Sequence, residues 1–185
     1  MLDLNRLLSL SPHEVLQKLA DKALELCRAD SVVISLLERG KVEDIFRWRA
    51  AAGALSGALG TAMPRDGSPC GMVLDLDADL LFTHPEQHFP FPGPVSPPIR
   101  EVLVTPFYDS VGQARGAIWI IAHGEDRKFD AEDLRLITGL AIFARSAMAT
   151  LESLGYEQSH NRRGKTPLGR AEVRERRNPR ELAQS

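Results

Sequence analysis

The spacing of apolar residues predicts an amphipathic helix near the start of the chain. Ser11, followed by proline, is typical of a helix N-terminus, and Glu14 completes a capping box with it. Apolar side chains then recur every three or four positions as far as Cys27, which is the spacing of one helix face. We expect this helix to end near Ala29, with residues 1–12 forming a Leu-rich leader helix before it.

Five segments farther along the chain have the composition of β-strands. Residues 42–50 alternate between apolar and polar, which places Phe46 and Trp48 on one buried face and two arginines on the other. Residues 117–121 are apolar throughout, so alternation does not decide which face of the sheet Trp119 occupies. The expected strands are 31–38, 42–50, 80–83, 101–109 and 114–123, with the first two and the last two forming hairpins.

Residues 85–98 interrupt this pattern with six of the twelve prolines of the chain. Such a run fits neither a helix nor a central strand, so it predicts a long loop of extended, polyproline-like backbone. Loops of this length in compact domains tend to be functional or mobile. We therefore expect the distinctive chemistry of the protein in this loop and in the irregular segment before it, residues 51–79.

A long amphipathic helix follows the last predicted strand. Asp130 is placed to cap it, and the two acidic residues in its first turn suit the helix dipole. We expect the helix to end at Gly155, followed by a basic and disordered tail at 156–185 with eight Lys and Arg against four Asp and Glu. Small residues in the apolar stripe of this helix would let a second helix approach closely. The stripe is formed by Ile137, Leu140, Ala141, Ala144, Met148 and Leu151.

The order of these elements predicts an α+β fold. A mostly antiparallel sheet would carry the N-terminal and C-terminal helices on one face, and the irregular segment 51–79 would cover the other. A concave ligand site is expected between that segment and the sheet. Residues 13–155 would form this one domain.

Composition indicates the class of protein and its compartment, but it does not indicate a function. Hydrophobic residues make up 43% of the chain and charged residues 26%, as in ordinary globular proteins. No apolar run reaches the ~18–20 residues of a membrane span, and the N-terminus does not have the pattern of a signal peptide. Only two cysteines are present, so we expect a reducing cytoplasm rather than a disulfide-stabilised secreted domain.

Four segments of the chain resemble the GAF domain family, in the same order along the sequence. They are the central segment Met63–Leu74, the strand Val104–Phe107 with its internal proline, the return strand 112–118 with its paired glycines, and Phe129–Asp133 at the opening of the last helix. Within this phytochrome-like superfamily, the stretches 66–71, 84–86 and 89–90 are similar to the GAF modules of bacterial sensor histidine kinases. The resemblance implies a PAS-like sheet, a role in sensing a small molecule or signal, and dimerisation through the terminal helices, residues 13–28 and 131–154.

The chain departs from the GAF domains whose ligands are defined by a motif. Phytochrome-type relatives attach a bilin to a cysteine that is often followed by histidine, whereas Gly71 follows Cys70 here. The Asn-Lys and Phe signature of cyclic-nucleotide-binding GAF domains is absent as well. Free methionine-sulfoxide reductases share the fold but use cysteines clustered in the middle segment, and Cys27 lies in a different element. These departures argue against a bilin and a cyclic nucleotide, and they leave the cofactor unknown.

Five residues are candidates for a ligand pocket: Trp48, Cys70, His84, Phe107 and Trp119. Cys70 follows a proline at the expected start of a short helix, where the helix dipole would make its thiol reactive; the alternative is a small buried side chain in the core. The three aromatic residues could form the walls around a planar ligand or serve as ordinary packing. His84 could instead anchor the proline-rich loop by hydrogen bonds.

Two patterns of polar residues have part of the spacing of a metal site. The aspartates of segment 75–79 are spaced as in a calcium loop, but Leu80 takes the place of the required glycine. His84 and His88 have no third ligand at a fixed spacing, as a zinc site would need. We therefore expect no metal site, and we expect His123, at the end of a strand, to face solvent.

The sequence contains no recognisable catalytic constellation. The leading hypothesis is a sensory, ligand-binding module of bacterial signal transduction that passes a signal through its terminal helices to a partner such as a two-component histidine kinase. One alternative is a redox sensor or methionine-sulfoxide-reductase-like enzyme that uses Cys70, and another is a dimeric adaptor without a ligand. The basic tail lacks interleaved aromatic residues, so nucleic acid is not an expected partner, and neither is a membrane.

Overall fold

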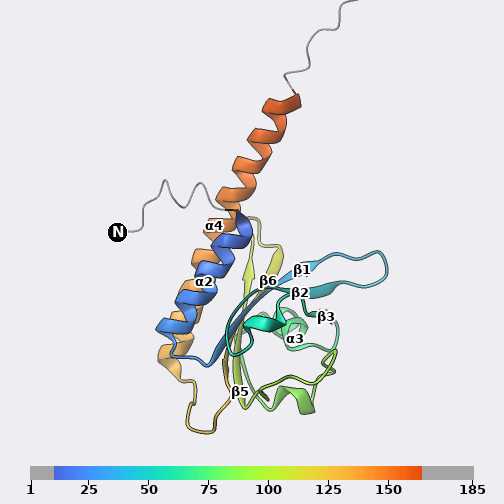
Figure 1. The fold of residues 1–185 in the computed structure, drawn as a ribbon. Coiled ribbons are helices and arrows are strands. Elements are labelled where there is room, and N and C mark those ends of the chain that lie inside the picture. Colours follow the sequence, from blue (N-terminus) through green and yellow to red (C-terminus); the bar gives the residue numbers. More distant parts are fainter. Residues whose placement is uncertain (1–10, 164–185) are drawn as a thin grey trace, which may run out of the picture.

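The computed structural model describes residues 11–163 and forms a six-stranded antiparallel sheet with helices on both faces (Figure 1). The strands lie side by side in the order β3-β2-β1-β6-β5-β4. The predicted α+β fold is confirmed. The elements are α2 (Pro12–Leu26), β1 (Ser31–Glu38), β2 (Ile45–Gly53), η1 (Ser56–Ala58), β3 (Ala62–Pro64), α3 (Pro69–Leu76), β4 (Leu80–Thr83), η2 (Pro85–Gln87), β5 (Glu101–Tyr108), β6 (Ala114–Ala122) and α4 (Ala131–Arg163).

Helix α2 begins as the sequence predicts. The Ser11 hydroxyl accepts a hydrogen bond from the N–H of Glu14, and the Glu14 carboxylate accepts one from the N–H of Ser11. The helix ends at Leu26, earlier than the predicted Ala29, because Arg28 adopts a left-handed conformation with a φ of 49°. A residue in this region of the backbone cannot continue a right-handed helix.

Helix α4 has the predicted start and a different end. The Asp130 carboxylate accepts hydrogen bonds from the N–H groups of Glu132 and Asp133, as expected of a cap. The expected stop at Gly155 is wrong, because α4 continues to Arg163. A glycine inside a helix costs about 1 kcal/mol relative to alanine, which is too little to end a long helix by itself. The predicted leader helix, apart from its last residues, and most of the predicted tail lie outside the described residues.

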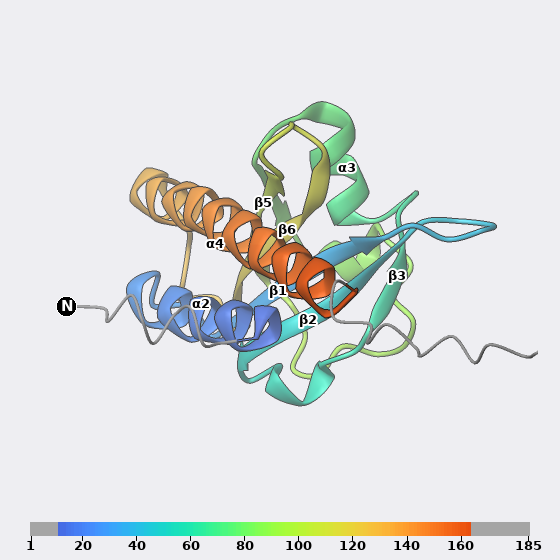
Figure 2. The same cartoon turned by 90° about the horizontal axis from the view of Figure 1, so that it is seen from above.

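The two faces of the sheet carry two separate hydrophobic cores (Figures 1 and 2). Helices α2 and α4 run antiparallel over one face, where they pack on Ile34 and Ile118 among others. Helix α3 and the segments around it cover the other face, where Val33 and Trp119 are buried. The structure thus places Trp119 on the α3 face, which the sequence left undecided. No helix within residues 11–163 is long and apolar enough to cross a membrane.

An irregularity in the β1–β2 pairing changes which side chains of strand β2 face each core. The register shifts between Ile34 and Ser35, so the alternation along β2 changes phase. Phe46 and Trp48 therefore face the α3 core, as predicted for these two residues, whereas Ala50 faces the helices. The shift places Ala51, rather than Ala50, on the same face as Trp48.

Candidate ligand pocket

A pocket of about 380 Å³ lies on the α3 face of the sheet, between two irregular segments. One wall is formed by the turn around η1, residues 54–61, and the other by the proline-rich segment 91–96. Trp48, from β2, contributes to the lining between them. Small-molecule sites typically span about 300–1,000 Å³, so the pocket has room for a small ligand. The sequence predicted a concave site between the irregular middle of the chain and the sheet, whereas this pocket lies between that middle and the proline-rich segment, with Trp48 as its one lining residue from a strand.

Trp48 is the predicted pocket residue that lines this cavity. Its side chain is 2% exposed and contacts the Trp119 ring edge-on, with the ring centroids 5.8 Å apart. The Trp48 indole N–H is buried and has no hydrogen-bond partner among the described residues. A buried N–H without an acceptor costs about 1–3 kcal/mol, so the site has an unfilled requirement for an acceptor.

The proline-rich wall of the pocket is held at its two ends. Within residues 11–163, no backbone–backbone hydrogen bond involves residues 90–97. On the N-terminal side, Phe89 packs edge-on against Phe82 of β4 at 5.3 Å between ring centroids. On the C-terminal side, the Pro98 carbonyl accepts a hydrogen bond of 2.9 Å from His123. A segment with so few backbone hydrogen bonds is expected to rearrange more readily than the strands beside it.

His123 connects the two walls of the pocket through a chain of hydrogen bonds. The Pro98 carbonyl can only accept, so Nδ1 of His123 must carry the proton in the 2.9 Å contact. Nε2 then accepts from the Ser31 hydroxyl at 2.8 Å, and Ser31 Oγ accepts from the N–H of Leu55 at 3.1 Å. Leu55 belongs to the wall around η1. The expectation that His123 simply faces solvent is therefore wrong.

Cys70 lies in the core beside the tryptophan pair and makes two polar contacts there. Its sulfur accepts a hydrogen bond of 3.0 Å from the Trp119 indole N–H and lies 3.2 Å from Ser35 Oγ. Ser35 donates its own proton to the Ala117 carbonyl, so the bond between Cys70 and Ser35 needs the thiol proton. Burial raises the pKa of Cys70 to about 12, although Cys70 lies in the first turn of α3. The sequence suggested that the helix dipole would lower the pKa of Cys70 and activate its thiol. Desolvation, which raises the pKa, outweighs that effect.

None of the other four predicted pocket residues lines this cavity: Cys70 and Trp119 lie in the core beside Trp48, and His84 and Phe107 lie elsewhere. His84 has a left-handed backbone and precedes η2, and its N–H donates to the Arg100 carbonyl at 3.1 Å. Phe107 is buried in the helix-side core, because alternation along β5 turns it away from the α3 face. It lines a separate hollow of about 240 Å³ between β5 and α4, together with Thr105 and Ile142 among others.

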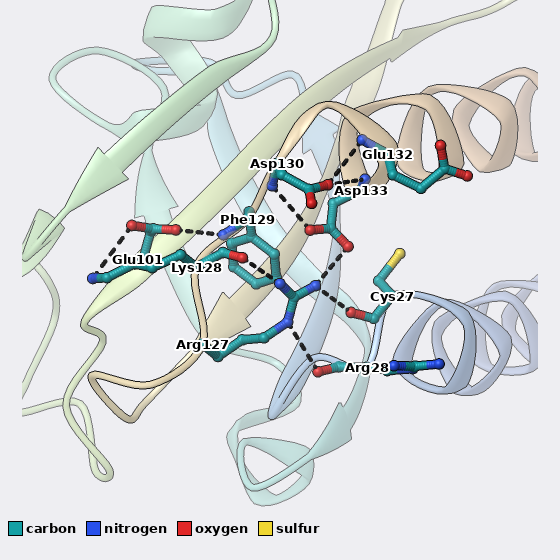
Figure 3. Close-up of polar contacts among 9 residues, drawn as sticks. All are labelled: Cys27, Arg28, Glu101, Arg127, Lys128, Phe129, Asp130, Glu132 and Asp133. Atoms are coloured by element: carbon teal, nitrogen blue, oxygen red, sulfur yellow. Dashed lines mark hydrogen bonds and ion pairs between the residues drawn. The ribbon is translucent and has the colours of Figure 1, made fainter.

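A second group of polar contacts joins the ends of α2 and α4 around Arg127 (Figure 3). The guanidinium donates hydrogen bonds to the carbonyls of Cys27 at 2.8 Å and Arg28 at 3.4 Å, just beyond the last turn of α2. It also pairs with the buried Asp133 carboxylate in the first turn of α4, at 2.6 Å. The same guanidinium lies 4.7 Å from the centre of the Phe129 ring. Arg127 thus holds the two helix ends to each other.

The sheet is fastened to this junction by Glu101, the first residue of β5. Its carboxylate is 4% exposed and accepts a hydrogen bond of 2.7 Å from the N–H of Phe129 (Figure 3). Its other oxygen lies 3.5 Å from the Lys128 ammonium group. Hydrogen bonds from the N–H groups of Asp133 and Glu132 lower the pKa of Asp130, because they stabilise its charged form. The start of α4 is therefore tied both to β5 and to the end of α2.

The acidic segment 75–79 makes ordinary surface contacts. Asp75 pairs with Arg65, and Asp77 accepts a hydrogen bond of 2.6 Å from the Tyr108 hydroxyl. No group of three or more His, Cys, Asp or Glu residues within the described part of the chain is arranged to hold a metal ion.

The sequence did not predict the roles of two residues. His123 connects the pocket walls, and Gln17 joins α2 to β2. A signal for the first was present, because Ser31 opens one strand and His123 follows another. Antiparallel pairing of those two strands brings these positions together. For Gln17, a polar residue between the two faces of α2, the sequence offered no such signal.

Comparisons with known proteins agree with this architecture. Residues 9–149 match the profile of the GAF domain family. The second GAF domain of DevS from Mycobacterium smegmatis is 22% identical, covers 82% of this chain and 99% of its own, and has a TM-score of 0.59. The GAF domain of a two-component sensor histidine kinase from Bacillus halodurans is 15% identical, with coverages of 80% and 99% and a TM-score of 0.58.

An enzyme is among the similar structures as well. Free methionine-R-sulfoxide reductase from Neisseria meningitidis, solved with its substrate, is 16% identical and has a TM-score of 0.65. The match covers 81% of this chain and 86% of the reductase. A comparison with curated protein sequences finds no significant match. At these identities the likeness establishes the fold, which sensory and catalytic proteins share.

Proposed function

The chain belongs to the GAF domain family, and on that premise we propose that it is a sensory module that binds a small molecule in the pocket beside Trp48. Ligand binding would change how α2 and α4 pack, and a signalling partner such as a histidine kinase would respond to that change. The ligand needs only to bind one arrangement of the helices better than another. The sensory domain would span residues 13–155, with the basic tail after it.

The observation that carries this proposal is the dual role of strand β2. Trp48 lines the pocket on one face of the sheet. Farther along the same strand, the backbone of Ala51 exchanges two hydrogen bonds with the Gln17 side chain of α2, at 3.0 and 3.3 Å. A displacement of β2 at the pocket would therefore act directly on α2. This short connection gives the ligand a physical path to the helices.

The helices are suited to carry the signal to another protein or to a second copy of this chain. Ile142 and Phe143 on α4 are 63% and 44% exposed, which is unusual for adjacent large apolar residues on one helix. We propose a homodimer formed through residues 13–28 and 131–154. Two free cysteines fit the reducing cytoplasm in which such a signalling protein would act.

Binding, rather than catalysis, is the proposed activity because neither cysteine is suited to act as a nucleophile. Cys70 is fully buried, and its pKa of about 12 leaves almost no thiolate at neutral pH. Cys27 is also buried, at the end of α2, and burial raises its pKa to about 11. The two lie in different cores, on opposite faces of the sheet, so they are not placed to form a disulfide with each other.

Filling the pocket by mutation tests the proposal without a known ligand. Ala58→Phe places a ring in the cavity, and Val111→Phe, on the exposed β5–β6 turn, is the matched control. We expect amide exchange in residues 12–26 to change at least threefold in the Ala58 variant and to stay unchanged in the control. Unaltered exchange in both helices, with the cavity shown to be filled, would contradict the proposed signal path.

A further inference from the structure

The lining of the pocket beside Trp48 contains no ionisable side chain. Its polar side chains are the Trp48 indole and the hydroxyls of Thr61 and Ser96. The Thr61 hydroxyl already donates to the Ala58 carbonyl at 2.7 Å. Arg47 and Arg49, on the same strand as Trp48, both pair with Glu38. Arg47 also donates to the Gly60 carbonyl at 3.2 Å, but neither arginine lines the cavity. A ligand carrying a phosphate or a carboxylate would therefore find no opposite charge in the lining.

The same lining favours flat, apolar molecules. Trp48 and Phe91 contribute aromatic surface, and Pro92 and Pro94 contribute rigid apolar surface. Aromatic rings gain from contact with such surfaces beyond the area that they bury. An ionic group brought into this environment would lose part of its hydration without an oppositely charged side chain to compensate it.

The unpartnered Trp48 N–H adds a directional requirement. The described residues contain two tryptophans, and they differ in this respect. The Trp119 N–H has the Cys70 sulfur as its acceptor at 3.0 Å, whereas the Trp48 N–H is buried without one. The N–H is closed to solvent, the cavity included, so an acceptor on a bound molecule would satisfy it only after the residues around Trp48 move.

We infer that the pocket takes an uncharged, largely aromatic molecule with a hydrogen-bond acceptor that receives the Trp48 N–H. This inference rests on the proposed ligand-binding function and specifies its ligand class. The proline-rich wall can shift to admit such a molecule, because its residues 90–97 make no backbone–backbone hydrogen bond within the described chain. The ends of this wall stay in place through Phe89 and through the bond between His123 and the Pro98 carbonyl.

Three small probes of similar shape test the two parts of this inference on the full-length protein. Acetophenone carries a neutral acceptor, ethylbenzene carries none, and benzoate carries a negative charge at pH 7. The measurement follows the two indole N–H resonances, one from each tryptophan, in a ¹⁵N-labelled sample. The Trp119→Phe variant lacks one of these peaks, so the peak that remains belongs to Trp48. We expect acetophenone to shift the Trp48 peak saturably and to bind about threefold to tenfold more tightly than ethylbenzene, as one hydrogen bond provides.

Two variants keep the test decisive. Trp48→Phe removes the donor while keeping an aromatic wall, and it should bring the affinities for acetophenone and ethylbenzene within about twofold of each other. Ala58→Phe fills the cavity and should abolish binding of both probes. This variant tests the site independently, should Trp48→Phe fail to fold. Benzoate binding as tightly as acetophenone, a preference for acetophenone that survives in Trp48→Phe, or no binding of either neutral probe at millimolar concentration would each overturn the inference.

The ligand class and the signalling role can fail separately. If acetophenone binds at Trp48 but leaves amide exchange in α2 and α4 unchanged, the ligand class holds and the proposed signal path does not. If Ala58→Phe changes exchange in the helices while no neutral probe binds, the signal path holds and the ligand class is overturned.

Discussion

Gln17 on α2 covers the backbone of Ala51 at the outer edge of strand β2, where β2 has its neighbour β1 on the other side only. The Gln17 amide donates to the Ala51 carbonyl at 3.0 Å and accepts from the Ala51 N–H at 3.3 Å. Strand β3 pairs with β2 only at Ile45–Arg47, so it does not reach Ala51. The side chain thus takes the part of a missing strand, which both protects an open sheet edge and couples α2 to the pocket strand.

Replacing Gln17 should loosen this coupling. Gln17→Ala removes two hydrogen bonds to a buried residue. Each bond contributes about 0.5–1.5 kcal/mol, so we expect the free energy of unfolding to fall by about 1–3 kcal/mol. Asp21→Ala is the control, because it removes only the exposed bond between Asp21 and Gln17. Urea denaturation measures the loss, and amide exchange at Ala51 should accelerate in the Gln17 variant alone. Equal effects of the two substitutions would refute the role assigned to Gln17.

Arg127 should contribute more to stability than an exposed arginine in the same region. Arg127→Ala leaves the Cys27 carbonyl and the buried Asp133 carboxylate without their partner, and we expect a loss of about 1–3 kcal/mol. Arg135→Ala, which removes an exposed pair with Glu132, should cost no more than about 0.5 kcal/mol. Denaturation curves of both variants decide the comparison. A loss for Arg127 no larger than that for Arg135 would show that the junction is not a stabilising clamp.

The sequence predicted the fold well because its strongest signals are local. The capping residues Ser11 and Asp130 and the alternation at Phe46 and Trp48 all depend on neighbours within a few positions. The face of Trp119 was undecided because its strand is buried on both sides, so its pattern carries no alternation. The local cost of a glycine predicts a stop at Gly155, but that cost is too small to end α4, which continues to Arg163.

The candidate site was predicted less completely because its contacts join distant segments. Trp48, Cys70 and Trp119 do lie together on one face, but Phe107 falls on the other through the alternation of β5. The role of His123 depends on Ser31 and Pro98, which are far from it in the sequence. Such contacts follow from strand order and loop path, and neither can be read from a single segment.

The two cysteines should be unreactive in the folded protein and should make it sensitive to alkali. Burial raises the pKa of Cys70 to about 12 and that of Cys27 to about 11, above the ordinary value of 9.0. The stabilising contribution of the protonated thiols is therefore complete below pH 9 and is lost as pH rises through 11 and 12. Iodoacetamide at pH 8 should modify the native protein far more slowly than the urea-unfolded protein.

A cysteine variant provides the control for this pH dependence. Cys70→Ser keeps an acceptor for Trp119 but has no group that ionises in this range. Its unfolding free energy should fall less steeply between pH 9 and 12 than that of the parent protein. An equally steep fall, or rapid alkylation of native Cys70, would show that the thiol is more accessible than its buried position implies.

Gly116 should not tolerate a side chain, because strands and an aromatic ring close in around it. A Cβ atom there would lie 2.0 Å from the Ser35 carbonyl oxygen and 2.9 Å from the Phe107 ring. Gly116→Ala should therefore destabilise the protein by about 1–3 kcal/mol or more. Gly139 in α4 has open space around the same position, so Gly139→Ala should stabilise by about 0.5–1 kcal/mol. Melting temperatures that move in opposite directions would confirm this contrast, and a harmless Gly116→Ala would contradict the close packing.

His123 should control access to Trp48, because it is the residue that ties the proline-rich wall to the wall around Leu55. His123→Ala removes the bonds to the Pro98 carbonyl and to Ser31, and the C-terminal end of the wall loses its polar anchor. In a Trp119→Phe background, Trp48 is the only tryptophan, and acrylamide quenching of its fluorescence reports its exposure to solvent. We expect the quenching constant to rise at least twofold in the His123 variant. His88→Ala, at an exposed histidine of the same proline-rich loop, is the control and should leave quenching unchanged. If quenching stays the same in both variants, the wall is held by packing alone, and the chain of bonds from Leu55 to Pro98 does not regulate entry to the pocket.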